Sequence, residues 1–182
     1  MKNVIFFDID TQYDFMRMGG KLYVPGAEEI IPNLKMITEF ADKNGISVIA
    51  SIDSHKMLVH KKIPETDIDN AVFVPNKKLS KLQLKKILKR NNLCILKQEH
   101  DVFSNPNTKK ILKNVKKAYV YGVATDYCVK AAVLGLIKMG VETYVIKDAI
   151  KPVSKKNEKK ELELLRKKGV KFLTTRQLLK RK

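Results

Sequence analysis

Short runs of consecutive apolar residues alternate along this chain with longer segments in which apolar residues recur every three or four positions. The short runs are rich in β-branched residues, which is typical of strands that are covered on both faces. The longer segments are typical of amphipathic helices. The pattern predicts strands at Val4–Asp8, Ser47–Ile52, Leu93–Lys97, Ala118–Gly122, Thr143–Lys147 and Val170–Leu173. It predicts helices at Glu28–Asn44, Leu82–Lys89, Thr108–Asn114, Asp126–Met139 and Asn157–Lys168.

This alternation predicts an α/β domain with a mostly parallel sheet of about six strands. We expect a single domain over residues 1–182, because a chain of this length fits one hydrophobic core. The stretch 54–80 has no clear period, and we interpret it as an irregular active-site excursion that is too short to hold its own core. In such sheets the active site lies beyond the carboxyl ends of the strands.

The net charge of +18 raises the question of a nucleic-acid partner, because clustered basic residues release counterions from phosphates. Only five of the 37 basic residues are arginines, although phosphate and base recognition favour the arginine fork. We therefore interpret the lysines as solvated helix faces and expect no nucleic-acid partner. No apolar run is long enough for a membrane span, and no basic leader precedes the first strand. Two cysteines are too few for a disulfide framework, so we expect a reduced, cytoplasmic protein.

Cys128 stands where a strand passes through a short turn into a helix, in the run Gly-Val-Ala-Thr-Asp-Tyr-Cys-Val. In the first turn of a helix, free N–H groups and the helix dipole stabilise a thiolate, and the same N–H groups can hold an oxyanion. A lone cysteine is more often a small buried apolar residue. Cys94, inside a predicted strand, fits that description, whereas Cys128 occupies a position that nucleophiles use.

Asp10 and Lys97 each follow or end a predicted strand, at the expected active-site edge of the sheet. A carboxylate there can act as a base toward a neighbouring thiol. A lysine there can lower the pKa of the thiol and keep the carboxylate ionised. Taken singly, Asp10 also fits a turn cap and Lys97 a solvated strand end.

The motifs together resemble the isochorismatase and nicotinamidase-like superfamily, and nicotinamidases most of all. The resemblance spans nearly the whole chain, with a gap over residues 54–92. It rests on Asp10-Thr11-Gln12-Tyr13-Asp14-Phe15, Gly19-Gly20-Lys21-Leu22, Val24-Pro25-Gly26-Ala27, the specific motif that ends at Cys128, Lys97 with Phe103-Ser104, Asp148-Ala149 and Lys168-Gly169-Val170.

The resemblance implies a three-layer α/β/α fold and an Asp–Lys–Cys triad made of Asp10, Lys97 and Cys128. It implies thiolate attack on a carbonyl carbon, loss of ammonia or an amine, and hydrolysis of the thioester by water, with Asp10 moving the protons. The oxyanion would be held by the backbone N–H groups of Ala124 and Cys128, and the Val123–Ala124 peptide is expected to be cis. Phe15 resembles the aromatic residue that stacks on the substrate, and Phe103 is a candidate for the opposite wall; both residues also fit ordinary packing.

Nicotinamidases bind a divalent metal through an Asp-x-His pair and a further histidine, and the metal holds the pyridine nitrogen. Here Asp53 and His55 match the pair, and imidazole with carboxylate suits zinc, iron or manganese. The usual later Pro-His-Cys segment is missing. Either His60 completes the site, or an acidic residue at position 65 or 67 does, or no metal binds. No organic cofactor is implied.

The resemblance favours a small amide as substrate, with nicotinamide first, and a hydrolase of the C–N amide bond. One alternative is a metal-independent hydrolase of another small amide, or an isochorismatase-type ether hydrolase. A second is a non-catalytic or nucleic-acid-binding relative. If the chain assembles, a closed homo-oligomer is expected.

Overall fold

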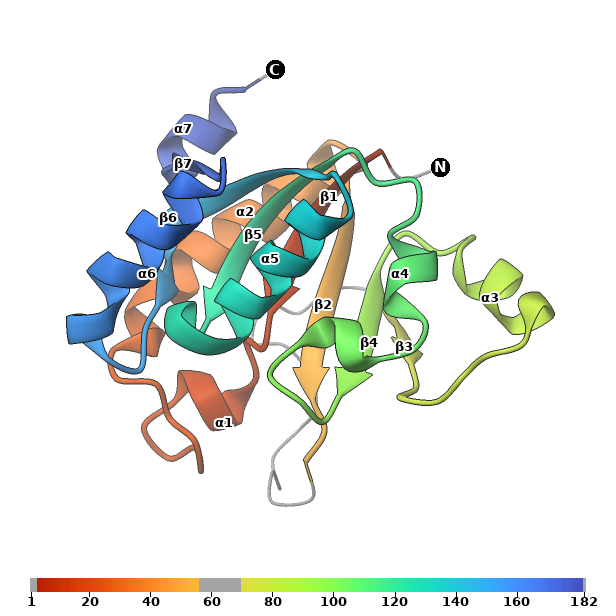
Figure 1. Ribbon diagram of the computed structural model, residues 1–182, viewed down its shortest axis with the longest axis horizontal. Coiled ribbons are helices and arrows are strands. Elements are labelled where there is room, and N and C mark those ends of the chain that lie inside the picture. Colours follow the sequence, from red (N-terminus) through yellow and green to blue (C-terminus); the bar gives the residue numbers. More distant parts are fainter. Residues whose placement is uncertain (1–2, 56–69, 182) are drawn as a thin grey trace.

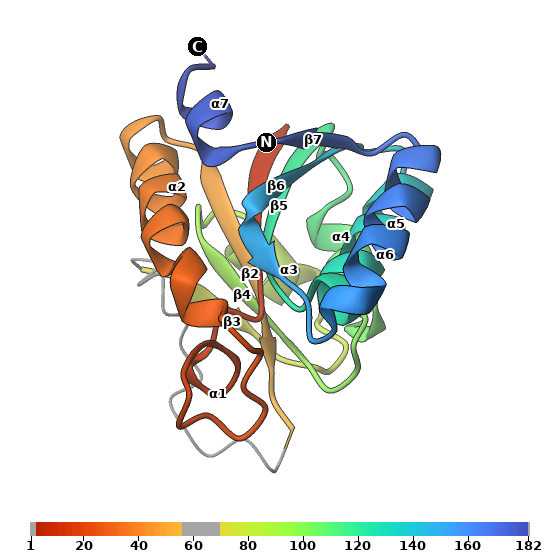
Figure 2. The ribbon, with the colours of Figure 1, turned by 90° about the vertical axis from the view of Figure 1, so that its left-hand side faces the viewer.

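The computed structural model describes residues 3–55 and 70–181. Its centre is a seven-stranded sheet of order β3-β4-β2-β1-β5-β6-β7, in which every pair is parallel. Helices cover both faces of the sheet, so the molecule has three layers (Figures 1 and 2). The strands are β1 (Val4–Ile9), β2 (Ser47–Asp53), β3 (Val72–Val74), β4 (Leu93–Lys97), β5 (Lys117–Val123), β6 (Glu142–Lys151) and β7 (Lys171–Leu173).

The predicted α/β class and parallel sheet are confirmed, but the sheet has seven strands instead of about six. The additional strand, β3, lies within the stretch that we expected to be irregular and pairs only with β4, at one edge of the sheet. Three residues are too few to show a period. Residues 56–69 of the same stretch lie outside the described part of the chain.

One face of the sheet is covered by α2 (Ile31–Lys43) and α7 (Thr175–Leu179), and the other by α5 (Lys130–Lys138) and α6 (Lys155–Lys167) (Figure 2). The shorter elements are α1 (Tyr13–Met16), α3 (Lys81–Ile87), α4 (Thr108–Ile111), the 3-10 turns η1 (Ala27–Ile30) and η2 (Val102–Ser104), and the π-helical turn η3 (Thr125–Val129). Within residues 3–55 and 70–181, no helix combines the length and the apolar character that crossing a membrane requires.

The sheet has a hydrophobic core on each face, and alternate side chains of β1 pack into one or the other. Ile5, Phe7 and Ile9 pack into the core on the α5 side, whereas Phe6 packs into the core on the α2 side, against residues such as Leu34. All four β1 side chains are fully buried. Burial of each such side chain contributes about 1.5–3 kcal/mol, so the central strand is fixed firmly from both faces.

Strand β5 approaches β1 closely at Gly122, and this contact positions the end of β5. Gly122 pairs with Ile9, and its φ of 112° lies in the range that favours glycine. A Cβ at this position would lie 2.1 Å from the carbonyl oxygen of Ile9. Only glycine therefore allows the carboxyl ends of β1 and β5 to meet as they do.

Candidate active site

The strand register brings polar residues together at the carboxyl edge of the sheet. Asp53, the last residue of β2, pairs with Lys97, the last residue of β4. Asp10 follows Ile9, which pairs with Ser51 of β2 on one side and with β5 on the other. Cys128 lies in η3, which follows β5 after a single residue.

Lys97 is the centre of a buried cluster that joins the three predicted triad residues. Its ammonium Nζ lies 2.8 Å from Oδ2 of Asp10, 3.7 Å from Sγ of Cys128 and 3.6 Å from Oδ2 of Asp53. Lys97 is fully buried, and Asp10 and Cys128 are nearly so. A buried ammonium is stable only when it is paired, and here two carboxylates provide the counter-charge.

The electrostatics of the cluster keep the lysine charged and the thiol protonated. Burial alone would lower the pKa of Lys97, but the charges of Asp10 and Asp53 and the hydrogen bond to Asp10 outweigh it and raise that pKa. Burial raises the pKa of the Cys128 thiol, and the charge of Asp10 raises it further. The charge of Lys97 lowers the thiol pKa, but its effect is smaller than these two together, so the thiol pKa lies above its ordinary value.

Lys97 thus acts on the thiol pKa in the expected direction, but its charge does not bring that pKa below its ordinary value. The desolvation of the sulfur and the two nearby carboxylates outweigh the single ammonium. A nucleophile in this environment must lose its proton to a neighbour as it attacks. Asp10, which shares the Lys97 ammonium with the sulfur, is a carboxylate that can take it.

The backbone and Ser51 fix the position of the Asp10 carboxylate. Asp10 has a φ of 51°, a left-handed conformation that aspartate tolerates better than most residues and that often occurs at functional sites. Its amide donates to the Ser51 carbonyl at 3.2 Å, and the Ser51 hydroxyl donates to Oδ1 of Asp10 at 2.7 Å. Ser51 thus occupies one carboxylate oxygen and leaves the other, Oδ2, facing Lys97.

The segment that carries Cys128 begins with an unusual backbone. The Val123–Ala124 peptide is cis, as expected from the resemblance. The carbonyl of Ala124 then accepts hydrogen bonds from the amides of Tyr127 and Val129, both at 3.1 Å, and Cys128 lies between these two donors. The cysteine was predicted in the first turn of an α-helix, and it stands instead in a π-helical turn ahead of α5. Such turns frequently mark functional sites.

Asp53 and His55 lie together, but the described residues do not complete a metal site. Oδ1 of Asp53 accepts a hydrogen bond from the His55 amide at 3.0 Å and contacts Nδ1 of the same histidine. Among residues 3–55 and 70–181, no group of three or more histidine, cysteine, aspartate or glutamate side chains is placed to hold a metal. His60 and the acidic residues at 65 and 67 lie outside the described part. Two donors do not hold a zinc ion alone, so we derive no step through a metal.

The two predicted aromatic walls differ in their surroundings. Phe15 lies in α1, just beyond the carboxyl end of β1, and packs partly buried against the core on the α2 side. Phe103 lies in η2 and packs against the other core, with its ring where a side chain of Gly135 in α5 would stand. These contacts fit the ordinary packing that was the alternative for Phe103.

Three residues of the site escaped the sequence analysis besides Ser51. Gln12 forms two hydrogen bonds with the backbone of Asp53. Its Nε2 donates to the Asp53 carbonyl at 3.0 Å, and its Oε1 accepts from the Asp53 backbone N–H at 2.6 Å. Asp126 accepts from the amides of Val153 and Ser154. His100 lies with Nδ1 3.9 Å from Sγ of Cys128. The sequence signal that could have indicated such residues is a polar residue inside or directly after an apolar strand.

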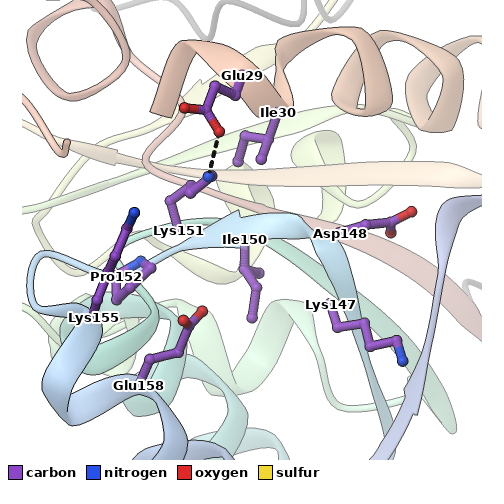
Figure 3. Close-up of a pocket in the computed structure, with 9 residues that line it drawn as sticks. All are labelled: Glu29, Ile30, Lys147, Asp148, Ile150, Lys151, Pro152, Lys155 and Glu158. Atoms are coloured by element: carbon purple, nitrogen blue, oxygen red, sulfur yellow. Dashed lines mark hydrogen bonds and ion pairs between the residues drawn. The ribbon is translucent and has the colours of Figure 1, made fainter. Parts of the chain in front are cut away.

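A separate cavity of about 290 Å³ lies over the end of β6 (Figure 3). Lys151 forms an ion pair across it with Glu29 at 2.7 Å. Its lining contains no cysteine or histidine, and its acidic and basic side chains are mixed. Its lining is Glu29, Ile30, Lys147, Asp148, Ile150, Lys151, Pro152, Lys155 and Glu158.

Comparison with known proteins adds independent findings. The isochorismatase domain family matches residues 4–177. No significant match to a curated protein was found. Among solved structures, the pyrazinamidase of Pyrococcus horikoshii in complex with zinc is 25% identical, with 94% of this chain and 99% of that chain covered and a TM-score of 0.74.

Two further structures support the fold. An isochorismatase-like hydrolase from Alkaliphilus metalliredigens is 20% identical, with 97% of each chain covered and a TM-score of 0.75. The pyrazinamidase/nicotinamidase of Streptococcus mutans is 20% identical, with 93% of this chain and 99% of that chain covered and a TM-score of 0.72.

Proposed function

The chain belongs to the isochorismatase family, and we propose that it is a cysteine-dependent amidohydrolase acting on a small amide, with nicotinamide as the first candidate. The observation that carries the proposal is the buried cluster in which one ammonium contacts both a carboxylate and a thiol. A core contains such a set of charges at a cost in stability, and acyl transfer is the chemistry for which a thiol next to a base is suited.

In the proposed reaction, the Cys128 thiol gives its proton to Asp10 while Sγ bonds to the amide carbonyl carbon. Lys97 holds the carboxylate and the developing thiolate through its charge. The oxyanion is held by the backbone N–H groups of Ala124 and Cys128. Asp10 passes the proton to the departing nitrogen, and the C–N bond breaks. Ammonia is released, and the acyl group remains on Cys128 as a thioester. Water then hydrolyses the thioester to the acid.

Nicotinamide is preferred among small amides because the chain resembles nicotinamidases in its motifs, and because the similar archaeal structure is a pyrazinamidase with zinc. Phe15 is the proposed stacking residue. Asp53, His55 and His60 are the proposed ligands of a zinc, iron or manganese ion. A second candidate is a metal-independent hydrolase of another small amide, which the lack of a Pro-His-Cys segment in the sequence favours.

Ammonia release from nicotinamide tests the proposal, measured with and without zinc, iron or manganese and after treatment with a chelator. Turnover that disappears in Cys128→Ala supports the amidohydrolase, and loss on chelation supports the metal. Turnover of other small amides that persists with chelator favours the second candidate. Absence of turnover with every amide and metal condition would contradict the proposal. Nucleic-acid binding with a steep salt dependence would then favour the non-catalytic alternative.

A further inference from the structure

The sulfur of Cys128 has proton-handling groups on two sides. On the buried side, Lys97 and Asp10 are almost completely shielded from solvent. On the other side is His100, which is an exposed residue and places Nδ1 3.9 Å from Sγ. An imidazole with access to solvent therefore lies beside the nucleophile.

Several contacts hold the loop that carries His100. The loop follows Lys97 directly. At its far end, the side-chain Nδ2 of Asn105 donates a hydrogen bond to the carbonyl of Leu96 at 2.8 Å. The Asp101 carboxylate accepts from the Phe103 amide at 2.9 Å, and the Phe103 ring packs over Gly135. The His100 ring itself lies against the ring of Tyr127, with centroids 5.3 Å apart and planes tilted by 47°. The loop that carries His100 is thus bonded to β4, and the His100 ring contacts Tyr127 of η3.

The two halves of the proposed reaction need a base in different places. In the first half, the proton comes from the buried thiol, and Asp10 is beside it. In the second half, the proton comes from a water molecule that arrives from solvent, after the substrate nitrogen has left. Asp10 has the same contacts with Ser51 and Lys97 in both halves, and it is almost completely shielded from the solvent that supplies this water. The described group that contacts the sulfur from the solvent side is His100.

We propose that His100 is a catalytic residue for the hydrolysis of the thioester, acting as general base toward the attacking water. This inference rests on the proposed function and assigns a step within it. The water oxygen bonds to the thioester carbon while the imidazole takes one water proton. The C–S bond then breaks, and the imidazolium returns that proton to the sulfur. The thiol is restored and the carboxylic acid leaves, so no other reactant is needed.

The test uses p-nitrophenyl acetate, an activated ester that acylates thiols without depending on the natural substrate. Wild-type protein, His100→Gln and the matched loop control Glu99→Gln are compared in the release of p-nitrophenolate. Glutamine keeps hydrogen-bonding groups but cannot carry a proton. We expect His100→Gln to show an undiminished burst of about one equivalent, then a steady rate lowered by about 10²-fold, the usual contribution of a general base. Glu99→Gln should behave as wild type.

Two further readouts separate a base from a structural role. Mass measurement of the intact protein and of the peptide that contains Cys128 should find a larger acetylated fraction in His100→Gln than in the wild type. Hydroxylamine, a nucleophile that attacks thioesters with little need of a base, should restore turnover of that variant. A lowered burst with unchanged steady rate would overturn the proposal, and so would a wild-type protein that forms no Cys128 acyl-enzyme. Failure to release ammonia from amides, with the ester results as expected, would contradict the amidase function alone.

Discussion

Cys94 lies in the sheet and Cys128 in the turn that follows β5, and the surroundings of the two thiols share one property and differ in another. Cys94 lies inside β4, and burial raises its pKa to about 12. Burial and Asp10 also raise the pKa of Cys128. Only Cys128 has a carboxylate, an ammonium and an imidazole arranged around it. Because Asp8 also lies near Cys94 and raises its pKa, the ammonium and the imidazole beside the sulfur distinguish the candidate nucleophile.

The sharpest test of this comparison removes each sulfur by changing the cysteine to alanine. Cys128→Ala should lower amide turnover by about 10⁴-fold or more, because a nucleophile has no substitute. Cys94→Ala should leave turnover within about twofold and lower the free energy of unfolding by roughly 1 kcal/mol, since it removes one buried atom from a packed strand. Steady-state kinetics and urea denaturation measure both. Equal losses of activity in the two variants would contradict the comparison.

Removing the acceptor next to Cys128 should have the next largest effect. Asp10→Asn keeps the shape of the side chain but cannot take the thiol proton, so turnover should fall by about 10²–10⁴-fold. Acylation by p-nitrophenyl acetate should also slow, which separates this variant from His100→Gln. Pre-steady-state measurement of the burst rate decides the matter, with circular dichroism as the control for folding. A normal burst rate in Asp10→Asn would argue against its role as base.

Ser51 offers a milder version of the same test. Ser51→Ala removes the 2.7 Å hydrogen bond to Asp10 but leaves the carboxylate and Lys97 in place. One lost hydrogen bond to a charged group corresponds to about 1.5–3 kcal/mol, so we expect turnover to fall by roughly tenfold to a hundredfold. Ser54→Ala, which removes a hydroxyl bonded to the Lys97 carbonyl, is the matched control and should have a smaller effect. The reverse order would contradict the positioning of Asp10 by Ser51.

The pH dependence of stability tests the property that the two thiols share, which is a pKa raised by burial. Because the folded-state pKa of Cys94 is raised from 9.0 to about 12, its contribution is complete below pH 9 and is lost as the pH rises toward 12. The slope approaches about 1.4 kcal/mol per pH unit for one thiol. Urea denaturation of wild type and Cys94→Ala between pH 8 and 11 measures it. The wild type should lose more stability over this range, and parallel curves would show that Cys94 is not shifted.

Much of the fold was predictable because long apolar runs carry a strong signal. The strand Leu93–Lys97 was predicted to the residue, and the ends of β1, β2 and β5 to within one residue. The short elements β3, α1 and α7 were missed, since fewer than six residues show no period. The end of β6 was also missed, because a bulge in its pairing with β5 lets the strand continue past Lys147 to Lys151.

The candidate site was predictable at the ends of the strands and not beyond them. Asp10, Lys97 and Cys128 do converge, since parallel strands bring their carboxyl ends to one edge. The thiol pKa could not be foreseen, because its direction depends on burial and on Asp53, neither of which the motif encodes. His100 was available as one of three histidines. Nothing in its spacing showed that the loop turns it back to the sulfur.

The most direct test of the account is to trap the thioester. The protein is mixed with nicotinamide, quenched in acid within the first turnovers, digested and analysed by mass spectrometry. We predict a nicotinoyl group on the peptide that contains Cys128, an unmodified peptide for Cys94, and a larger trapped fraction in His100→Gln. Ammonia release that continues in Cys128→Ala, or an acyl group on any other residue, would contradict the account.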